Sequence, residues 1–231
     1  MRPHSIVLAA SLLLSTLLCA SGQTTSGEGP KFKPAELISA TSIPFPIHSD
    51  TWGLVVLQAV VKNNGDVGKI IPIREIQSLT ASAVAEVKNW RFRSATLDDK
   101  PVRSRVEIAI MFNPFTGPAT AKLQPLSASS DEDARDSTLP PQPPDVLSAL
   151  SAVNPLYSSA VLWPGVVLQL RINSGGEVEE SRAVKDLPPF TAVANDALKK
   201  WLFAAPRYNG KFISAPIVVA FSFQPPPTYT P

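Results

Sequence analysis

Cysteine and histidine are nearly absent from this chain, and their scarcity excludes several kinds of chemistry. The 231 residues include one cysteine, Cys19, and two histidines, His4 and His48. Because Cys19 and His4 fall within the first 22 residues, the rest of the chain has no thiol and a single imidazole. Cys–His catalysis, His-rich metal sites and a disulfide framework are therefore excluded, so side-chain packing must hold the core together.

Charge is also limited, and no charged cluster indicates a reaction. Charged residues make up 17% of the chain and the net charge is +2, which gives no reason to expect nucleic acid or an anionic membrane surface as a partner. The pair Gly175-Gly176 fits a strand-to-strand turn rather than a phosphate loop. His48 fits a loop position, and Glu177, Glu179 and Glu180 fit a solvated hairpin. We therefore predict no catalytic residue, no metal site, no cofactor and no small-molecule substrate.

The first 22 residues have the pattern of a secretory signal peptide. Arg2 precedes a 15-residue apolar run from Ile6 to Ala20, and small residues then offer a cleavage site before Gln23. This run is short for a membrane span, which needs about 20 residues. We expect cleavage and a periplasmic or secreted chain. An uncleaved inner-membrane anchor is the alternative, and a membrane is expected as a partner only through that anchor.

One sequence pattern occurs twice, at an offset of 111 positions. Trp90 and Trp201 lie at this spacing, and each follows an apolar helix-like stripe and precedes a phenylalanine two positions later. The same ungapped offset places Val55–Gln58 on Val166–Gln169, and it aligns the pairs Pro44/Pro155, Trp52/Trp163, Gly65/Gly176, Val67/Val178, Lys100/Lys211 and Phe112/Phe223. A register that preserves two tryptophan pairs predicts an internal repeat.

Each repeat predicts a β-hairpin, a helix and a further strand. In the first repeat the strands are expected at 54–62 and 67–73, around a turn at 63–66, and Ser78 is the candidate N-cap of a helix ending near Trp90. In the second repeat Pro188-Pro189 precedes the helix, a position that proline tolerates. The residues expected to face inward are Val55, Leu57, Ala59, Val61, Val106, Ile108, Ile110 and Phe112, and then Val166, Leu168, Leu170, Ile172, Ile217, Val219, Phe221 and Phe223.

The predicted fold class is α+β, with two tandem ββαβ units, each a small antiparallel sheet with one helix packed on it. Runs rich in proline, serine and aspartate separate and follow the repeats and mark linkers. The expected organisation is a signal peptide at 1–22, a disordered lead-in at 23–33, the first repeat at 34–113, a linker at 114–143, the second repeat at 144–224 and a proline-rich tail at 225–231.

This order of elements, with these residues, resembles the TonB C-terminal domain family. The residues that carry the resemblance are Pro44, Gly53, Val55, Leu57, Val61, Gly65, Val67, Ala83, Trp90, Phe92, Val102 and Phe112 in the first repeat, and Pro155, Gly165, Val166, Leu168, Ile172, Gly176, Val178, Ala194, Trp201, Phe203, Pro206, Gly210 and Phe223 in the second. Ile43 and Asn154 stand where the family often has tyrosine, and Asp99 stands where it has a turn glycine.

The resemblance implies a periplasmic protein-binding module linked to TonB-type transmembrane transport. In that family the last strand is an open edge to which receptors add a short strand. The candidate edges are 102–112 and 214–223, and the expected partner-binding residues are Arg103, Arg105, Glu107, Ala109, Ser214, Ala215, Val218 and Ala220. The tandem pair is expected either to bind two strands or to pair its own edges as a pseudo-dimer.

Two hypotheses of function remain open at this point, and neither is an enzyme. In the first, the module binds outer-membrane receptor segments, but it does not transduce energy alone because a cleaved signal peptide leaves no anchor. In the second, the chain is a self-associating structural or scaffold protein of the cell envelope whose partner is itself.

Overall fold

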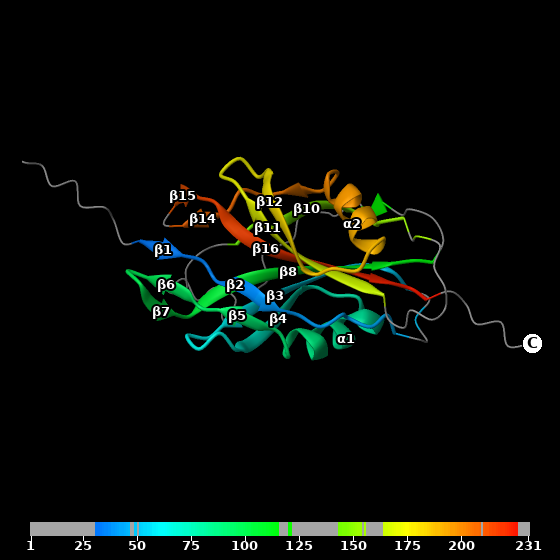
Figure 1. The fold of residues 1–231 in the computed structure, drawn as a ribbon, viewed down its shortest axis with the longest axis horizontal. Helices are drawn as coiled ribbons and strands as arrows, with labels where there is room; N and C mark the ends of the chain where they lie inside the picture. Colours follow the sequence, from blue (N-terminus) through cyan, green and yellow to red (C-terminus); the bar gives the residue numbers. More distant parts are fainter. Residues whose placement is uncertain are drawn as a thin grey trace, which may run out of the picture.

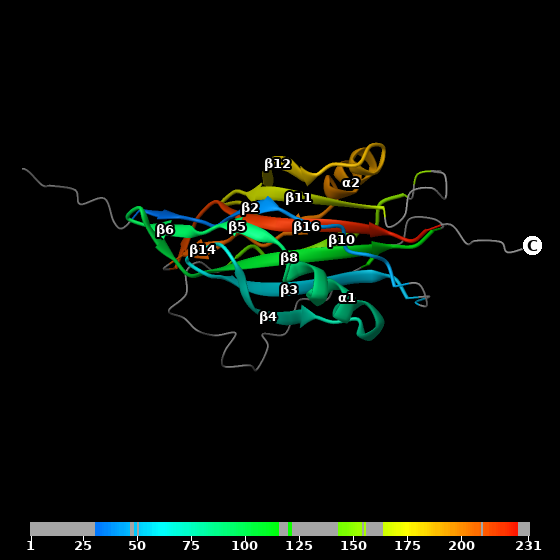
Figure 2. The same ribbon diagram turned by 60° about the horizontal axis from the view of Figure 1, so that its bottom comes forward.

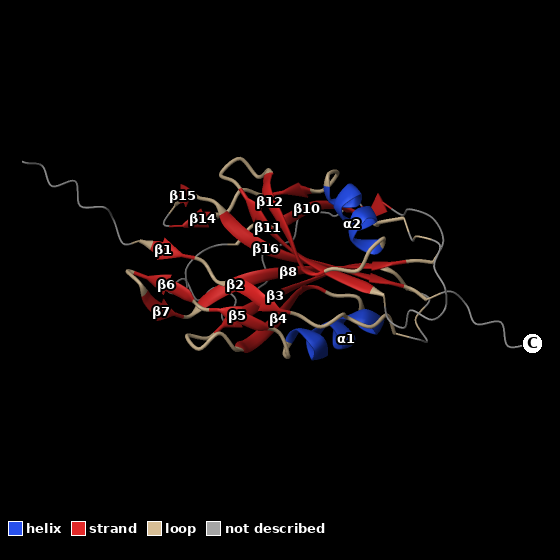
Figure 3. Ribbon diagram, in the orientation of Figure 1, coloured by secondary structure: helices blue, strands red, loops and turns tan. Residues whose placement is uncertain are grey.

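The structure of the chain is a computed structural model that describes residues 31–46, 49, 51–115, 120–121, 143–153, 155, 164–208 and 210–225. The predictions for the signal peptide, for His48 and for most of the lead-in, linker and tail fall outside these residues. The fold is mixed α+β, as predicted (Figure 3). None of the helices in the described parts of the chain is long and apolar enough to span a membrane.

One six-stranded sheet runs through the centre of the molecule (Figure 1). Its strand order is β12-β11-β16-β8-β3-β4, so each repeat supplies three adjacent strands. The strands are β3 (Gly53–Val61), β4 (Val67–Arg74) and β8 (Ser104–Asn113) from the first repeat, and β11 (Gly165–Ile172), β12 (Val178–Lys185) and β16 (Ala215–Phe223) from the second. The helices α1 (Gln77–Val87) and α2 (Phe190–Leu198) lie on opposite sides of this sheet (Figure 2).

The two repeats join where β8 pairs with β16. Strands are antiparallel within each repeat, but β8 and β16 are parallel, in a register that runs from Ile108 opposite Val218 to Asn113 opposite Phe223. In a separate repeat this strand would present a row of unpaired N–H and C=O groups. Pairing the two strands satisfies both rows, so the two small sheets of the repeats join into one, and the repeats pair their own edges, which was one of the two expected arrangements.

Both faces of the sheet are buried, each under the helix of one repeat. The first core holds the predicted inward residues Val55, Leu57, Ala59, Val61, Val106, Ile108, Ile110 and Phe112, together with Val167, Val218 and Ala220 of the second repeat. The second core holds Val166, Leu168, Leu170, Ile172, Ile217, Val219, Phe221 and Phe223, together with Leu54, Val56, Ala109 and Met111 of the first repeat. The predicted alternation is confirmed, and each repeat also completes the core of the other.

A short lead strand at the start of each repeat was not predicted. β2 (Glu36–Ser39) pairs with β5 (Arg91–Arg93), and β10 (Val146–Leu150) pairs with β13 (Leu202–Phe203) and β9 (Thr120–Ala121). Each of these lead strands lies against the other repeat: the Leu37 N–H donates to Gln169 Oε1 at 2.6 Å, and the Ala152 N–H donates to Asn113 Oδ1 at 2.8 Å. The repeats are therefore interlocked as well as joined at the sheet.

Small hairpins complete one end of the molecule. They are formed by β1 (Phe32–Lys33), β6 (Ala95–Leu97) and β7 (Lys100–Val102), and by β14 (Arg207–Tyr208) with β15 (Lys211–Phe212). A turn joins β6 to β7, with Asp98 and Asp99 at φ values of 50° and 62°. Aspartate tolerates this left-handed region better than most residues, which allows the turn to form without glycine.

The start of α1 differs from the prediction, whereas the start of α2 agrees with it. Ile76, not Ser78, is the N-cap of α1, and Thr80 Oγ1 accepts the Ile76 N–H at 2.9 Å. Ser78 is inside the helix, where its hydroxyl lies 3.0 Å from that of Ser49. Pro189 directly precedes α2, as predicted.

Candidate functional site

The strands that were predicted to be open edges lie in the interior of the sheet. β8 pairs with both β3 and β16, and β16 pairs with both β8 and β11. Of the predicted binding residues, Glu107, Ala109, Ala215, Val218 and Ala220 are buried, Arg105 is half-buried and Arg103 and Ser214 lie at the strand starts. The edge assignment was wrong, because each repeat occupies the edge of the other. Contact of these residues with a partner stays a prediction.

The outer strands of the sheet are β4 and β12, and they differ in how well they can accept another strand. β4 contains Pro72, which has no N–H and so removes a donor from the strand. Ala183 takes the position of Pro72 in β12, 111 residues later in the sequence. Their strand partners, Leu57 for Pro72 and Leu168 for Ala183, are related by the same offset. From Val178 to Ala183 the side chains of β12 are exposed. Among the described strands, β12 is therefore the better acceptor.

A pocket of about 810 Å³ opens between β12 and α2. Leu170, Leu198 and Trp201 give it apolar walls, while Val178 and Leu202 line it with side chains that are 40% and 61% exposed. The indole N–H of Trp201 donates to the Leu150 carbonyl at 2.9 Å, which fixes the ring. The remaining lining residues are Gly176, Glu177, Ser181, Ala183, Asn195 and Lys199. The pocket is thus mainly apolar with a polar margin, as ligand-binding pockets usually are.

The first repeat shows which side chains occupy the corresponding positions beside α1. Ile70 of β4 and Val84 of α1 pack against the first core. The equivalent residues of the second repeat, 111 positions later, are Ser181 and Asn195. Ser181 Oγ lies 3.2 Å from Asn195 Oδ1, so a short polar pair replaces two branched apolar side chains. The space that isoleucine and valine fill in one repeat is left open in the other.

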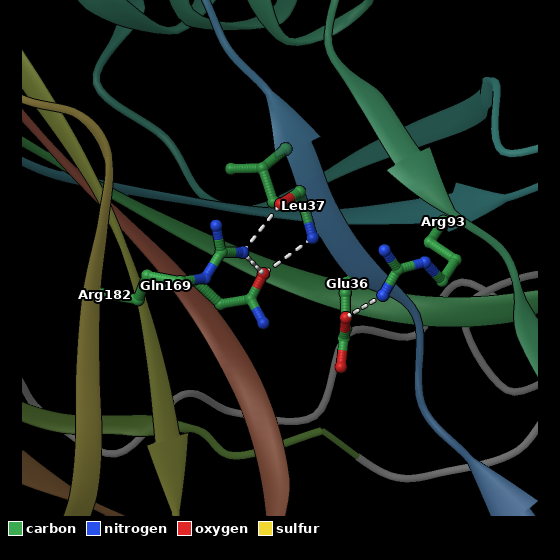
Figure 4. A network of polar contacts seen from close by, with 5 residues as sticks. All are labelled: Glu36, Leu37, Arg93, Gln169 and Arg182. Carbon is green, nitrogen blue, oxygen red and sulfur yellow. Dashed lines mark hydrogen bonds and ion pairs between the residues drawn. The ribbon is translucent and has the colours of Figure 1, made fainter.

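Polar contacts hold β12 to the first repeat from the face opposite the pocket. Arg182 Nη2 donates to the Leu37 carbonyl at 2.8 Å and to Gln169 Oε1 at 3.3 Å, and Gln169 Oε1 also accepts the Leu37 N–H (Figure 4). Beside them, an ion pair of 2.6 Å between Arg93 and Glu36 ties β5 to β2. Arg182 therefore ties the middle of β12 to the lead strand β2 of the first repeat.

Glu107, a predicted binding residue, is a fully buried carboxyl on β8. Burial raises its pKa well above the ordinary value, the nearby Asp145 carboxyl raises it further, and the Val146 N–H lowers it. Its Oε1 atom has no hydrogen-bond partner. Val146 begins β10, so Glu107 anchors the lead strand of the second repeat as Gln169 anchors that of the first.

The described residues contain no cluster of three or more side chains suited to a metal ion. The pocket beside β12 has one carboxylate, Glu177, and one ammonium group, Lys199, among its lining residues.

Residues 47–114 match the family model described as the Gram-negative bacterial TonB protein C-terminal. This segment, which includes β3, β4, α1 and β8, is therefore similar to a family that is associated with TonB-type transport. No curated protein and no solved structure matches the chain. The membership of the second repeat in the same family stays a prediction.

Proposed function

We propose that this chain is a periplasmic protein-binding module, linked to TonB-type transport, that takes an extended protein segment by strand addition on β12. The observation that carries the proposal is the pocket beside β12, which opens next to the outer strand without proline. The family match to residues 47–114 supports the transport context. The binding edge differs from the one that the resemblance implied, because β8 and β16 close each other.

The two parts of this site do different work. The outer backbone groups of β12 supply hydrogen bonds that any extended chain can make, so they give affinity without selectivity. Side chains of the added strand alternate between faces, and those on the α2 face lie over Leu170, Leu198 and Trp201. Burying one large apolar side chain there contributes about 1.5–3 kcal/mol. The pocket therefore selects segments with an apolar residue at that position.

The test replaces the site with residues from the first repeat. The double variant Ser181→Ile with Asn195→Val places the larger apolar side chains of the first repeat in the pocket and narrows it. We expect it to weaken binding of apolar extended peptides about tenfold or more, since roughly 1.4 kcal/mol corresponds to one factor of ten. Ala183→Pro removes a β12 donor and should weaken all peptides alike. Binding is measured by fluorescence anisotropy against a library of labelled receptor-derived peptides.

A matched control lies on the other outer strand. Lys69→Ala, on β4, changes an edge residue far from the pocket and should leave binding unchanged. If the pocket-filling variant binds the same peptides with unchanged affinity, the pocket has no part in recognition and the proposal fails.

The proposal excludes energy transduction by this chain alone. Transmitting force requires an anchor in the inner membrane, whereas residues 1–22 are expected to be cleaved. N-terminal sequencing of the protein from cell envelopes tests this. Recovery of a membrane-inserted chain that still carries residues 1–22 would overturn the exclusion.

A further inference from the structure

The exposed strand β12 carries opposite charges on the two sides of its midpoint. Glu180 precedes Ser181 and Arg182 follows it, and the three pair in regular register with Arg171, Leu170 and Gln169 of β11. Strand alternation therefore puts the two charged side chains on the same face, away from the pocket. Glu180 is 58% exposed, and its ion pair with Arg171, at 3.3 Å, leaves one side of the carboxylate open to solvent.

This arrangement makes β12 complementary to itself when a second molecule runs antiparallel. With Ser181 of one molecule opposite Ser181 of the other, Glu180 of each molecule lies opposite Arg182 of its partner. The opposite-charge pair therefore forms twice. Shifting the register to centre on Glu180 or on Arg182 places like charges directly opposite each other. Opposite charges across a strand pair are favourable and like charges are not, so of these three registers only the Ser181-centred one avoids a like-charge pair.

We propose that a second molecule of this chain pairs antiparallel with β12 in that register, which joins two six-stranded sheets into one. This inference rests on the proposed function in one respect, that β12 is an accessible edge strand, and the second molecule is the partner that it assigns to that edge. The pairing has two-fold symmetry and closes, which limits assembly to a dimer. The other outer strand, β4, contains Pro72 and does not present charges of opposite sign in this way.

The dimer and the extended segment use the same backbone groups, so they compete. At high protein concentration the second molecule covers the edge, and a peptide must displace it. Dilution or a tightly bound peptide should therefore give monomers. The chain then has a resting form in which the outer strand is protected from indiscriminate strand addition, which exposed edges otherwise permit.

Charge reversal on single residues provides a test with its own rescue. Glu180→Arg puts arginine opposite arginine in a homodimer, and Arg182→Glu puts glutamate opposite glutamate. We expect each variant to dimerise about tenfold more weakly or worse, since two favourable pairs become unfavourable. An equimolar mixture of the two variants restores both opposite-charge pairs, and it should dimerise like the unmodified protein. Sedimentation equilibrium measures all three association constants.

A second variant covers the case in which Arg182→Glu disturbs the fold, since Arg182 also contacts Leu37. The double variant Glu180→Gln with Arg182→Gln keeps hydrogen-bonding side chains and removes the charges. It should dimerise several-fold more weakly, and its remaining association should fall less steeply with added salt.

An unmodified protein that stays monomeric at several hundred micromolar would overturn the inference, and so would a mixture of the two charge variants that fails to associate. Peptide binding reports separately on the proposed function. If the protein is monomeric but the pocket-filling variant still loses peptide affinity, the dimer is wrong and the binding module stands. If the protein dimerises but no peptide binds in the pocket, the dimer stands and the binding module is wrong.

Discussion

The contact between Gln169 and the lead strand β2 gives the clearest prediction of how the repeats hold together. Gln169 Oε1 accepts the buried Leu37 N–H at 2.6 Å and one N–H of Arg182 at 3.3 Å. Gln169→Leu keeps nearly the same volume and leaves the Leu37 N–H without an acceptor. An unsatisfied buried donor costs about 1–3 kcal/mol, so the free energy of unfolding should fall by that amount.

The first repeat supplies the matched control for this prediction. Gln58 stands at the equivalent place on β3, opposite Glu107, and is half-buried. No described contact depends on the Gln58 amide, so Gln58→Leu should change the free energy of unfolding by no more than about 0.5 kcal/mol. The pair of variants therefore separates the contact with β2 from the general effect of removing a sheet glutamine.

Urea denaturation followed by tryptophan fluorescence measures both variants. The loss for Gln169→Leu should appear as a lower midpoint with an unchanged slope, because the same surface is exposed on unfolding. In a chain of this size each kcal/mol also lowers the melting temperature by roughly 2–4 °C. Equal losses for the two variants, or a loss below about 0.5 kcal/mol for Gln169→Leu, would refute the reasoning.

Three further predictions follow from the buried carboxyl, the turn glycines and the shared cores. Glu107 has a raised pKa in the folded protein, so the stability that its protonated form contributes is complete below the ordinary pKa of 4.5 and is lost as pH rises through the raised pKa. Glu107→Gln should therefore become more stable relative to the unmodified protein, in free energy of unfolding, from pH 4.5 toward neutrality. A difference that stays constant across a pH series would contradict this prediction. Gly65 has φ +86°, and a Cβ there would lie 2.0 Å from the Phe92 carbonyl oxygen, whereas a Cβ at Gly210, with φ +74°, would have no atom within 4 Å. Backbone strain, about 1–2 kcal/mol, is common to both positions, so Gly65→Ala should lower the melting temperature far more than Gly210→Ala. Equal shifts measured by calorimetry would count against the steric explanation. A fragment of residues 34–113 lacks Val167, Val218 and Ala220, which contribute to its core, and it exposes the edge of β8. Circular dichroism of this fragment should therefore show no cooperative thermal unfolding. A sharp transition in a monomeric fragment would show that the repeat folds independently.

Much of the fold was predictable because alternation and turn chemistry are local properties. The hairpins around Gly65 and Gly176 and the inward faces of β3, β8, β11 and β16 agree with the periodicity of the sequence. The joining of the two sheets was left open, although the sequence carries a signal for it. β3 and β16 read as nearly continuous apolar runs, as strands buried on both faces do, whereas β12 is mostly polar.

The candidate site could not be found in the same way, because it depends on differences between the repeats rather than on their likeness. Aligning the repeats emphasises what they share, such as Trp90 with Trp201. The pocket arises where they diverge, with Ser181 in the place of Ile70 and Asn195 in the place of Val84. Sequence alone does not show that these two positions face each other across a strand and a helix, because that contact depends on how α2 packs on the sheet.

The pairing of β8 with β16 has a consequence for where any partner can bind. A single domain of this type leaves its last strand as an edge, and a partner strand adds there. Here the duplicated unit uses that edge for its own assembly, so each repeat gains a core and loses a binding surface. The six-stranded sheet then has β4 and β12 as its outer strands, and the proline of β4 favours β12 for the proposed strand addition. At the positions of Ile70 and Val84, which pack against the first core, the second repeat has Ser181 and Asn195, so the proposed function assigns binding to the second repeat.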